Sequence, residues 1–455
     1  MPRLPSRVAP RAVADPDVRL SYAVDAAATR TPPALDFEVV RARDVDDVVS
    51  VLEHAQATGT PVVPQGARTS RAGGAAASDG CIVLNVEALD AIHDIDELEG
   101  YAVVGPGVVN ADLKRAAASS GLFYGPDPAS WETCTIGGNV ATNAGGLCCV
   151  KYGVTSDWVK ALQVILPGGE VMRTGHRTAK GVAGYDLTGL FVGSEGTLGV
   201  VTQAVLRLEP APDPALTALA VFDSLDAAVA GIVALRRDPH RPSLLEIIDR
   251  TSVRAIQSFG DFGFPDDCAA VLLVQSDRPG HVAEDLGRYA ALLRSAGAVD
   301  VAVADDAQES EALLAGRRVM STAFEAMGVR LAEDVCVPVG RLGDFVRGIE
   351  AIGERRSVLI PVSGHAGDGN LHPSIVYTPT DPESVARAWD AFGDVIELGL
   401  SLGGTITGEH GVGTVKVPWL GLELGAAEME RQRRLKAVFD PLGIMNPGKV
   451  FPTGP

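Results

Sequence analysis

Glycine is concentrated at a few places in this chain, and this concentration constrains the fold more than any other feature. Of the 455 residues, 51 are glycine, and three clusters lie in the first half, at residues 66–74, 137–146 and 193–199. Scattered glycines would indicate only many turns, whereas clustered glycines indicate places where the backbone approaches something closely. The clusters therefore predict a ligand that lies against bare backbone.

The first cluster follows a short predicted strand at residues 61–63 and continues through Ser70. Gly66 allows the loop to fold back, so that the N–H groups after it point at an anion, and Thr69 and Ser70 add hydroxyl donors. Neither the P-loop pattern nor a complete GxGxxG pattern occurs in the chain. For this loop taken alone, an ordinary glycine-rich turn is the alternative.

The second and third clusters combine glycines with polar side chains. In the loop from Thr135 to Gly146, bare backbone would face a polar heterocycle while Asn139, Thr142 and Asn143 supply hydrogen bonds. The third cluster lies in a stretch, Gly193 to Thr202, that is predicted to pass from a loop into a strand, which would carry backbone groups to the edge of a ring. The three clusters together predict one cofactor site.

Three of the eight histidines fall in two further glycine-rich stretches of the second half. The glycines around His365 and His372 exclude a stable helix, so the two imidazoles are expected to converge through a bent, extended segment. With Glu409 they make a set of two histidines and one carboxylate, which leaves positions open for a substrate on Zn²⁺, Mn²⁺ or a similar ion. Three polar residues in glycine loops are the alternative.

A 2-hydroxy acid is a substrate that such an ion would chelate through the hydroxyl and one carboxylate oxygen. His410 is then a candidate for the general base, because an unperturbed histidine has a pKa near 6.5. Arg317, ahead of Arg318, is a candidate for binding the substrate carboxylate in bidentate fashion. Ordinary solvated helix charges are the alternative for this arginine pair.

Composition excludes several other classes of protein. The 58 acidic and 39 basic side chains leave a net charge of −19, which argues against binding nucleic acid or anionic lipid. The six cysteines show neither CxxC pairs nor iron–sulfur spacing, and no apolar stretch reaches the length of a transmembrane helix. We expect a cytoplasmic protein without a transmembrane segment; a peripheral position at the inner face of the membrane is the alternative.

Proline marks the predicted division of the chain. Three prolines between Glu209 and Pro214 are tolerated by neither a helix nor a central strand, so a domain boundary is placed there. The predicted parts are an irregular N-terminal extension (1–35), a first domain (36–214), a second domain (215–430) and a C-terminal segment (431–455). Within them, residues 45–58, 225–237 and 282–297 are predicted helices, and residues 82–86, 101–104 and 270–275 are predicted strands.

Five motifs, in order, resemble the FAD-binding domain of the vanillyl-alcohol oxidase superfamily, also called the PCMH-type fold. They are PQGARTS, GPDP, TIGGNVATNAGG, GYDL and GSEGTLGVVT. The resemblance implies that the first loop binds the pyrophosphate of FAD and that the later segments line the ribityl chain and the ring. No histidine lies in these loops, which suggests noncovalent FAD. The implied FAD-binding residues are Pro64, Gln65, Gly66, Ala67, Arg68, Thr69, Ser70, Pro126, Asp127, Thr135, Gly137, Gly138, Asn139, Thr142, Asn143, Gly145, Glu195, Gly196, Leu198, Gly199, Val200 and Asn446.

The second half is similar to the C-terminal domain of FAD-linked D-2-hydroxy-acid dehydrogenases, on the stretches PVSGHAGDGNLHP, GGTITGEHGVG and FDPLGIMNPGK. The resemblance implies an α+β fold: a PCMH-type FAD-binding domain of two α/β subdomains and an inserted cap domain, whose antiparallel sheet is covered by helices. It also implies that the C-terminal segment returns to the flavin near Asn446. The implied roles are metal ligand for His365, His372 and Glu409, base for His410, carboxylate binding for Arg317, and substrate contact for Ser321 and Asn370.

The expected reaction is oxidation of a D-2-hydroxy acid to the 2-oxo acid, with hydride passing from C2 to flavin N5. Hydroxyglutarate enzymes of this group carry a lysine that aligns with Ala332, which favours lactate or glycolate, although Arg330 is a candidate substitute. Two alternatives are a flavoprotein subunit of a multi-subunit glycolate oxidase and an alkylglycerone-phosphate-synthase-like transferase, whose consecutive active-site histidines this chain lacks. A third alternative is a flavin-binding protein that has lost catalysis. Such a protein would be expected to have lost part of the set His365, His372, Glu409 and His410, and all four are present.

The expected partners are a small anionic substrate and an electron acceptor. A quinone, a cytochrome and an electron-transfer flavoprotein are the candidate acceptors, and a homodimer is a candidate oligomeric state.

Overall fold

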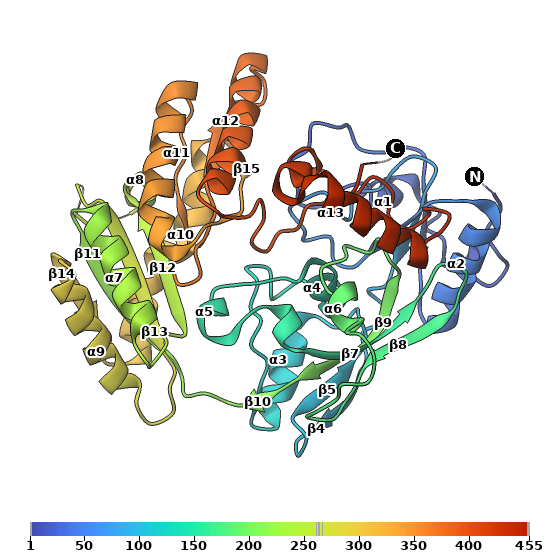
Figure 1. The fold of residues 1–455 in the computed structure, drawn as a ribbon, viewed down its shortest axis with the longest axis horizontal. Coiled ribbons are helices and arrows are strands. Elements are labelled where there is room, and N and C mark those ends of the chain that lie inside the picture. The colour runs from blue at the N-terminus through green and yellow to red at the C-terminus, as the bar shows by residue number, and fades with distance from the viewer. Residues whose placement is uncertain (1, 261, 263, 266, 453–455) are drawn as a thin grey trace. The chain divides into compact units, whose positions relative to one another are not determined.

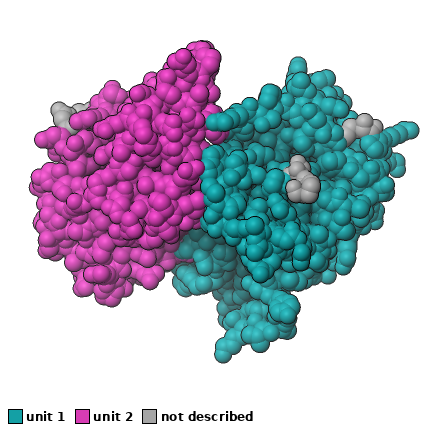
Figure 2. Space-filling model, turned by 45° about the horizontal axis from the view of Figure 1, so that its top comes forward, with its two compact units in different colours: residues 1–145, 153–211, 409–455 teal, residues 146–152, 212–408 magenta. Residues whose placement is uncertain are grey.

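The structure is a computed structural model that describes residues 2–260, 262, 264–265 and 267–452. The chain divides into two compact units, which Figure 2 colours separately. Unit 1 contains residues 1–145, 153–211 and 409–455, and unit 2 contains residues 146–152 and 212–408. The sequence-based domain boundaries at 35, 214 and 430 stay predictions.

In its described residues, unit 1 contains three small sheets. Its strands are β1 (Glu38–Arg41), β2 (Val62–Gln65), β3 (Ile82–Asn85), β4 (Ile92–Asp96), β5 (Tyr101–Val104), β6 (Leu122–Phe123), β7 (Val159–Ile165), β8 (Val171–Gly175), β9 (Val200–Arg207) and β10 (Glu209–Pro210). The first sheet is parallel, in the order β1-β3-β2, and the second is antiparallel, in the order β4-β5-β9-β7-β8. Strands β10 and β6 form an antiparallel pair. Of the three prolines in this stretch, only Pro210 lies in a strand, the two-residue β10, while Pro212 and Pro214 lie outside helices and strands, as expected for residues that cannot donate a backbone hydrogen bond.

Helix α2 in unit 1 begins and ends where the sequence predicts. Its other helical segments are η1 (Ala9–Arg11), α1 (Pro16–Leu20), α3 (Asn110–Ser119), α4 (Ile136–Thr142), η2 (Thr155–Asp157), α6 (Thr188–Phe191) and α13 (Val417–Phe439). Helix α2 (Val45–Thr58) starts after Asp44, whose side chain accepts from the backbone N–H of Asp47, and ends at Gly59, which has φ = 67°. These are the capping contacts that such residues favour.

Two predictions about local structure in unit 1 are wrong. The N-terminal segment is not irregular throughout, because η1 and α1 form there and Val8 lies fully buried in the core with α2 and β3. The second glycine cluster is not a loop throughout, because its first part forms α4. Thr135 caps this helix by accepting from the N–H of Gly138, so the threonine offsets the low helix propensity of the adjacent glycines.

Unit 2 is built on one antiparallel sheet of seven strands, in the order β14-β11-β13-β12-β17-β18-β16, and a separate pair, β15-β19. The strands are β11 (Leu216–Phe222), β12 (Leu244–Asp249), β13 (Ala270–Ser276), β14 (Asp300–Val303), β15 (Val329–Ala332), β16 (Val335–Cys336), β17 (Ser363–His365), β18 (Asn370–Leu371) and β19 (Ser374–Tyr377). Strands β11, β12 and β13 are mostly apolar, as expected for a sheet whose two faces are both covered by helices.

The helical segments of unit 2 are α5 (Cys149–Tyr152), α7 (Leu225–Arg237), α8 (Arg250–Gln257), α9 (Val282–Ser295), α10 (Ala307–Met327), η3 (Val339–Arg341), α11 (Leu342–Arg356) and α12 (Pro382–Ser401). Helices α7 and α9 pack together against β11 and β13 (Figure 1). Helices α8 and α10 share a hydrophobic core with alternate residues of the same strands, including Leu219 and Leu273, and therefore cover the opposite face. Among the described residues, no helix is both long enough and apolar enough to cross a bilayer.

Candidate active site

Glycine contacts bring the predicted cofactor loops of unit 1 against one another. A Cβ atom added at Gly66 would lie 2.3 Å from Oγ1 of Thr135, and one added at Gly74 would lie 2.7 Å from Oε2 of Glu195. The first loop therefore packs closely on the second and the third motif. These glycines are needed for contact between the loops, in addition to any contact with a ligand.

Asn446 ties two of these loops to the C-terminal segment. Its Nδ2 donates to the carbonyl oxygens of Gly74, at 2.9 Å, and Glu195, at 2.7 Å. The backbone N–H of Asn446 donates to the carbonyl of Val62 on β2, and Met445 forms a parallel bridge with the same residue. The C-terminal segment is thus part of the loop framework of unit 1.

Gln65, the last residue of β2, connects the first loop to the N-terminal segment of unit 1. Its Nε2 donates to the carbonyl oxygens of Tyr22 and Ala75, at 2.9 and 2.6 Å. Among the described residues, neither Oε1 of Gln65 nor Oδ1 of Asn446 has a hydrogen-bond partner, although both atoms are buried. Buried acceptors of this kind need a donor. We call the loop after β2, the third motif and the segment at Asn446 the cradle of unit 1, and a polar cofactor bound there would supply such donors.

Glu195 connects the third motif to the segment that follows His410. Its carboxylate accepts from the backbone N–H groups of Val412 and Gly413, each at 2.8 Å. Burial raises the pKa of Glu195 to about 7, and the two hydrogen bonds only partly oppose this shift. The Glu195 side chain therefore connects its own loop to the backbone at Val412 and Gly413, a segment that lies far away in the sequence.

The polar side chains of the second motif have partners inside unit 1. Oδ1 of Asn139 accepts from Nδ2 of Asn110 at 3.0 Å, and Oγ1 of Thr142 donates to the carbonyl of Gly138. Oδ1 of Asn143 accepts from the N–H of Ser156 at 2.8 Å. These contacts hold α4 in place, and hydrogen bonds from the same side chains to FAD stay a prediction.

Left-handed backbone conformations occur repeatedly among the predicted cofactor residues. Arg68, Asn143, Glu195 and Asn446 have φ angles of 59°, 50°, 50° and 43°. Such conformations are costly for residues other than glycine and concentrate at functional sites. The strain therefore supports a ligand site where these loops meet, and the residues present fit FAD.

The remaining predicted cofactor residues also lie in unit 1. They are Pro64 at the end of β2; Ala67, Thr69 and Ser70 in the loop after it; Pro126 and Asp127 after β6; Gly137 in α4; Gly145 after α4; Gly196, Leu198 and Gly199 before β9; and Val200 at the start of β9.

In unit 2, the register of the sheet aligns several candidate residues in one row. On β17, Gly364 lies opposite Ile247 of β12, so the next pair in this antiparallel register is His365 and Glu246. His365 in turn lies opposite Asn370 of β18. Directly opposed residues project from the same face of a sheet, so these three side chains share the face that α10 covers.

His365 and His372 converge as the sequence predicts. His365 ends β17 and His372 follows β18, and their Nε2 atoms lie 3.3 Å apart. His365 is buried and His372 is half-buried. Asn370, between them in the sequence, is also buried, and its Oδ1 has no hydrogen-bond partner among the described residues.

Glu246 joins His365 to Arg317 of α10. Oε1 of Glu246 lies 2.5 Å from Nδ1 of His365, and Oε2 accepts from Nε of Arg317 at 3.0 Å. Burial alone would raise the pKa of Glu246, but the charges and hydrogen bonds of His365 and Arg317 outweigh it and lower the pKa to about 2. Glu246 is therefore an ionised, fully buried carboxylate with two basic partners.

The other substrate candidates lie along α10 and β15. Ser321 follows Arg317 by one helical turn and accepts from Nη2 of Arg330 at 2.7 Å. Arg330 also lies 3.7 Å from a carboxylate oxygen of Glu325. Arg318 is exposed and paired with an acid of its own helix, whereas Arg317 is half-buried beside Glu246.

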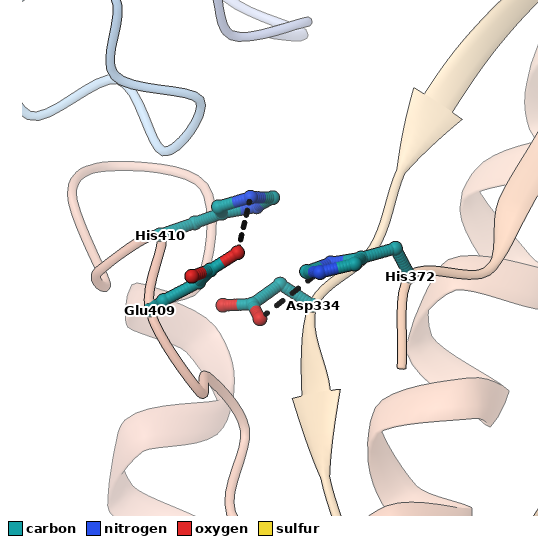
Figure 3. A group of neighbouring side chains, drawn as sticks. All are labelled: Asp334, His372, Glu409 and His410. Carbon is teal, nitrogen blue, oxygen red and sulfur yellow. Dashed lines mark ion pairs between the residues drawn. The ribbon is translucent and has the colours of Figure 1, made fainter. Parts of the chain in front are cut away.

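Two further acid–histidine pairs complete the candidate set, and Figure 3 shows both. In unit 2, Oδ1 of Asp334 lies 3.8 Å from Nδ1 of His372. In unit 1, Oε1 of Glu409 lies 3.8 Å from Nε2 of its neighbour His410. Each of these four side chains offers one atom that can bind a metal ion. Imidazole and carboxylate donors suit Zn²⁺ or Mn²⁺.

Sequence reasoning missed Glu246 and Asp334. Glu246 stands inside the apolar run from Leu244 to Ile248, and a charged residue in a buried strand needs partners. That signal indicates a buried carboxylate but not which residues it contacts.

Two protein-family models match the chain. FAD binding domain matches residues 38–175, and FAD linked oxidases, C-terminal domain, matches residues 211–450.

The chain also resembles several known proteins. It is 39% identical to the glycolate oxidase subunit GlcD of Bacillus subtilis, covering 95% of this chain and 92% of the relative. It is 34% identical to the D-lactate dehydrogenase of Anaerostipes hadrus, covering 90% and 89%. Among solved structures, substrate-bound p-cresol methylhydroxylase matches with a TM-score of 0.81 at 16% identity, covering 97% of this chain and 94% of that one. The last likeness concerns the fold alone, and it confirms the PCMH-type fold.

Proposed function

This chain belongs to the FAD-linked oxidases, and from that premise we propose that it oxidises a small D-2-hydroxy acid to the 2-oxo acid. The observation that carries the proposal is the arrangement in unit 2, where Glu246 contacts both Arg317 and His365, and His365 contacts His372. The relatives named glycolate oxidase subunit and D-lactate dehydrogenase support the same substrate class.

Arg317 binds the carboxylate of the substrate in this proposal. Its Nε is held by Glu246, and the two terminal nitrogens make no hydrogen bond within the described part of the chain. A guanidinium fork that is anchored at Nε is oriented to bind a carboxylate in bidentate fashion. Ser321 and Asn370 are proposed to contact the rest of the substrate.

His365, His372 and Glu409 are the proposed ligands of a divalent ion, and Asp334 is a further candidate. Such an ion would lower the pKa of the substrate hydroxyl. His410 accepts the hydroxyl proton as general base. FAD, when bound noncovalently in the cradle of unit 1, supplies the acceptor for the hydride of C2.

A monocarboxylate is favoured over 2-hydroxyglutarate. A second substrate carboxylate would need a cation of its own, and Ala332 supplies none. Arg330 is the nearest candidate in the sequence, but it already donates to Ser321 and lies beside Glu325. D-lactate and glycolate are therefore the preferred substrates.

Anaerobic addition of hydroxy acids to the purified flavoprotein tests the proposal. We expect D-lactate or glycolate to bleach the visible flavin band, D-2-hydroxyglutarate to bleach it more slowly, and L-lactate to have no effect. Treatment with a chelator should slow bleaching, and Zn²⁺ or Mn²⁺ should restore it. The proposal fails if none of these acids bleaches the flavin with metal supplied.

A second candidate is that the chain acts as one subunit of a glycolate oxidase, because the Bacillus subtilis relative is named as a subunit. In that case glycolate would reduce the flavin of the isolated chain, but electrons would reach an acceptor only when partner proteins are added. Steady-state turnover with a quinone, a cytochrome or an electron-transfer flavoprotein, measured on the isolated chain, separates the two candidates. The compartment and the homodimer stay predictions.

A further inference from the structure

The position of Glu246 in the sheet of unit 2 is fixed by strands on both sides. Glu246 pairs with Leu273 of β13 on one side, and the register with β17 puts His365 on the other. Leu273 belongs to the core beneath α8 and α10, so Glu246 projects towards α10 and Arg317. Its side chain is buried and has little freedom to reorient.

The two carboxylate oxygens of Glu246 are divided between two residues with different proposed roles. One lies 2.5 Å from Nδ1 of His365, and the other accepts from Nε of Arg317 at 3.0 Å. Because Glu246 contacts Nδ1 of His365, it orients the imidazole so that Nε2 faces His372. Because Nε of Arg317 is occupied, its terminal nitrogens are left for a carboxylate.

Charge also favours a carboxylate at this position. A half-buried arginine beside a buried histidine would otherwise place positive charge in the interior without compensation. A neutral amide of the same shape can accept from one of the two N–H groups, but its NH₂ group then faces the other donor.

We propose that Glu246 is a positioning residue that fixes Arg317 and His365 relative to each other, so that the carboxylate and the hydroxyl of one 2-hydroxy acid are bound at a set spacing. This inference rests on the proposed function. It adds one residue, Glu246, that orients both the side chain that binds the substrate carboxylate and a side chain at the hydroxyl. Histidine ligands of metal ions are commonly oriented by a carboxylate on the second ring nitrogen; here the same carboxylate also orients the substrate-binding arginine.

The test compares Glu246→Gln with Asp285→Asn in the purified holoprotein. Asp285 of α9 is a matched control because it is a buried carboxylate of unit 2 that pairs with Arg278 and Ser276, and α9 packs on the face of the sheet away from α10. Three quantities are measured for each protein: Zn²⁺ affinity by calorimetry, KM and kcat for the hydroxy acid that bleaches the wild-type flavin, and FAD content.

We expect Glu246→Gln to lower Zn²⁺ affinity by about 10- to 100-fold and to raise KM by about 10-fold, with FAD content unchanged. Glu246→Asp keeps the charge but retracts the carboxylate, so it should show a smaller loss in the same direction even if the glutamine variant fails to fold. Zn²⁺ affinity and KM equal to those of Asp285→Asn would overturn the proposal.

The failure of the proposed function is distinguishable from the failure of this inference. If the wild-type protein binds Zn²⁺ but oxidises no hydroxy acid, the proposed function is wrong, and the Zn²⁺ affinity of Glu246→Gln still decides whether Glu246 orients His365. A wild-type protein that binds no Zn²⁺ would overturn the His365 half of the inference.

Discussion

Glu195 in unit 1 and Glu246 in unit 2 are both buried at the candidate sites, and their pKa values are shifted in opposite directions. Glu246 in unit 2 contacts two basic side chains, and its pKa is lowered to about 2 although burial opposes this. Glu195 in unit 1 contacts two backbone N–H groups, and burial raises its pKa to about 7. Burial of both carboxylates thus gives opposite results, because the charges and hydrogen bonds of His365 and Arg317 outweigh desolvation and two backbone hydrogen bonds do not.

The difference also separates two kinds of site. Glu246 orients side chains that are proposed to handle the substrate, whereas Glu195 holds backbone segments together. Loss of the first should therefore affect binding and turnover, and loss of the second should affect the stability of unit 1.

The largest effect on stability is expected for Glu195→Ala. The substitution leaves the buried N–H groups of Val412 and Gly413 without their acceptor, which costs on the order of 2–6 kcal/mol for the two groups. Hydrogen–deuterium exchange of residues 411–414 should become faster, and the protein should lose FAD on gel filtration. Ser194→Ala, in the same loop, is the control and should match the wild type. Unchanged exchange at residues 411–414 would show that Glu195 does not stabilise this segment.

The pH dependence of stability gives a smaller effect. A carboxyl group whose pKa is higher in the folded than in the unfolded state binds more protons when folded, so stability falls as pH rises between the two pKa values. For Glu195 this window runs from the ordinary value of 4.5 to about 7, and the loss is about 3 kcal/mol at about 1.4 kcal/mol per pKa unit. Above about 7, the contribution no longer changes.

Glu195→Gln should remove this slope. Burial also raises the pKa values of Asp25 and Asp249, so the difference between the wild type and the variant isolates Glu195. The measurement is the urea midpoint at several pH values between 4.5 and 7. A difference that stays constant over this range would contradict the raised pKa of Glu195.

For Glu246 the pH dependence of stability has the opposite sign. Its lowered pKa contributes stability that is present above about pH 4.5 and is lost as pH falls towards about 2.

The smallest effect is expected for a carboxylate–arginine pair at the surface of unit 2. Arg356 donates to Asp394 at 2.7 Å and lowers the pKa of Asp394. Both side chains reach solvent, where exposed ion pairs contribute little. Arg356→Ala should therefore leave the urea midpoint and KM unchanged. A decrease in urea midpoint as large as that of Glu195→Ala would mean that burial does not explain the difference in stability effect between the two residues.

Local signals predicted much of the fold. Asp44 and Gly59 mark the ends of α2, the apolar periodicity of residues 225–237 matches α7, and strand β13 lies where the apolar run from Ala270 predicts it. The convergence of His365 and His372 also followed from local sequence, because glycines excluded a helix between them.

Long-range pairing could not be predicted in the same way. The contact of Glu246 with His365 depends on the register of two strands that are more than a hundred positions apart, and the contact of Glu195 with Val412 joins separate segments of unit 1. Helix α4 was missed because its glycines disfavour a helix locally, while the cap at Thr135 and packing favour one. A single sequence contains no direct signal for such partners.

The pairing of β2 with the segment at Met445 and Asn446 has a consequence for biosynthesis. Strand β2 leaves the ribosome early, but the residues that complete its cradle are added only after residues 212–408, which take roughly 10–40 s at about 5–20 residues per second. During this interval unit 2 can fold, whereas the carbonyl groups of Gly74 and Glu195 still await Asn446. Nascent chains therefore expose an unfinished cradle to chaperones and proteases, and cofactor loading is expected to be a late step of maturation.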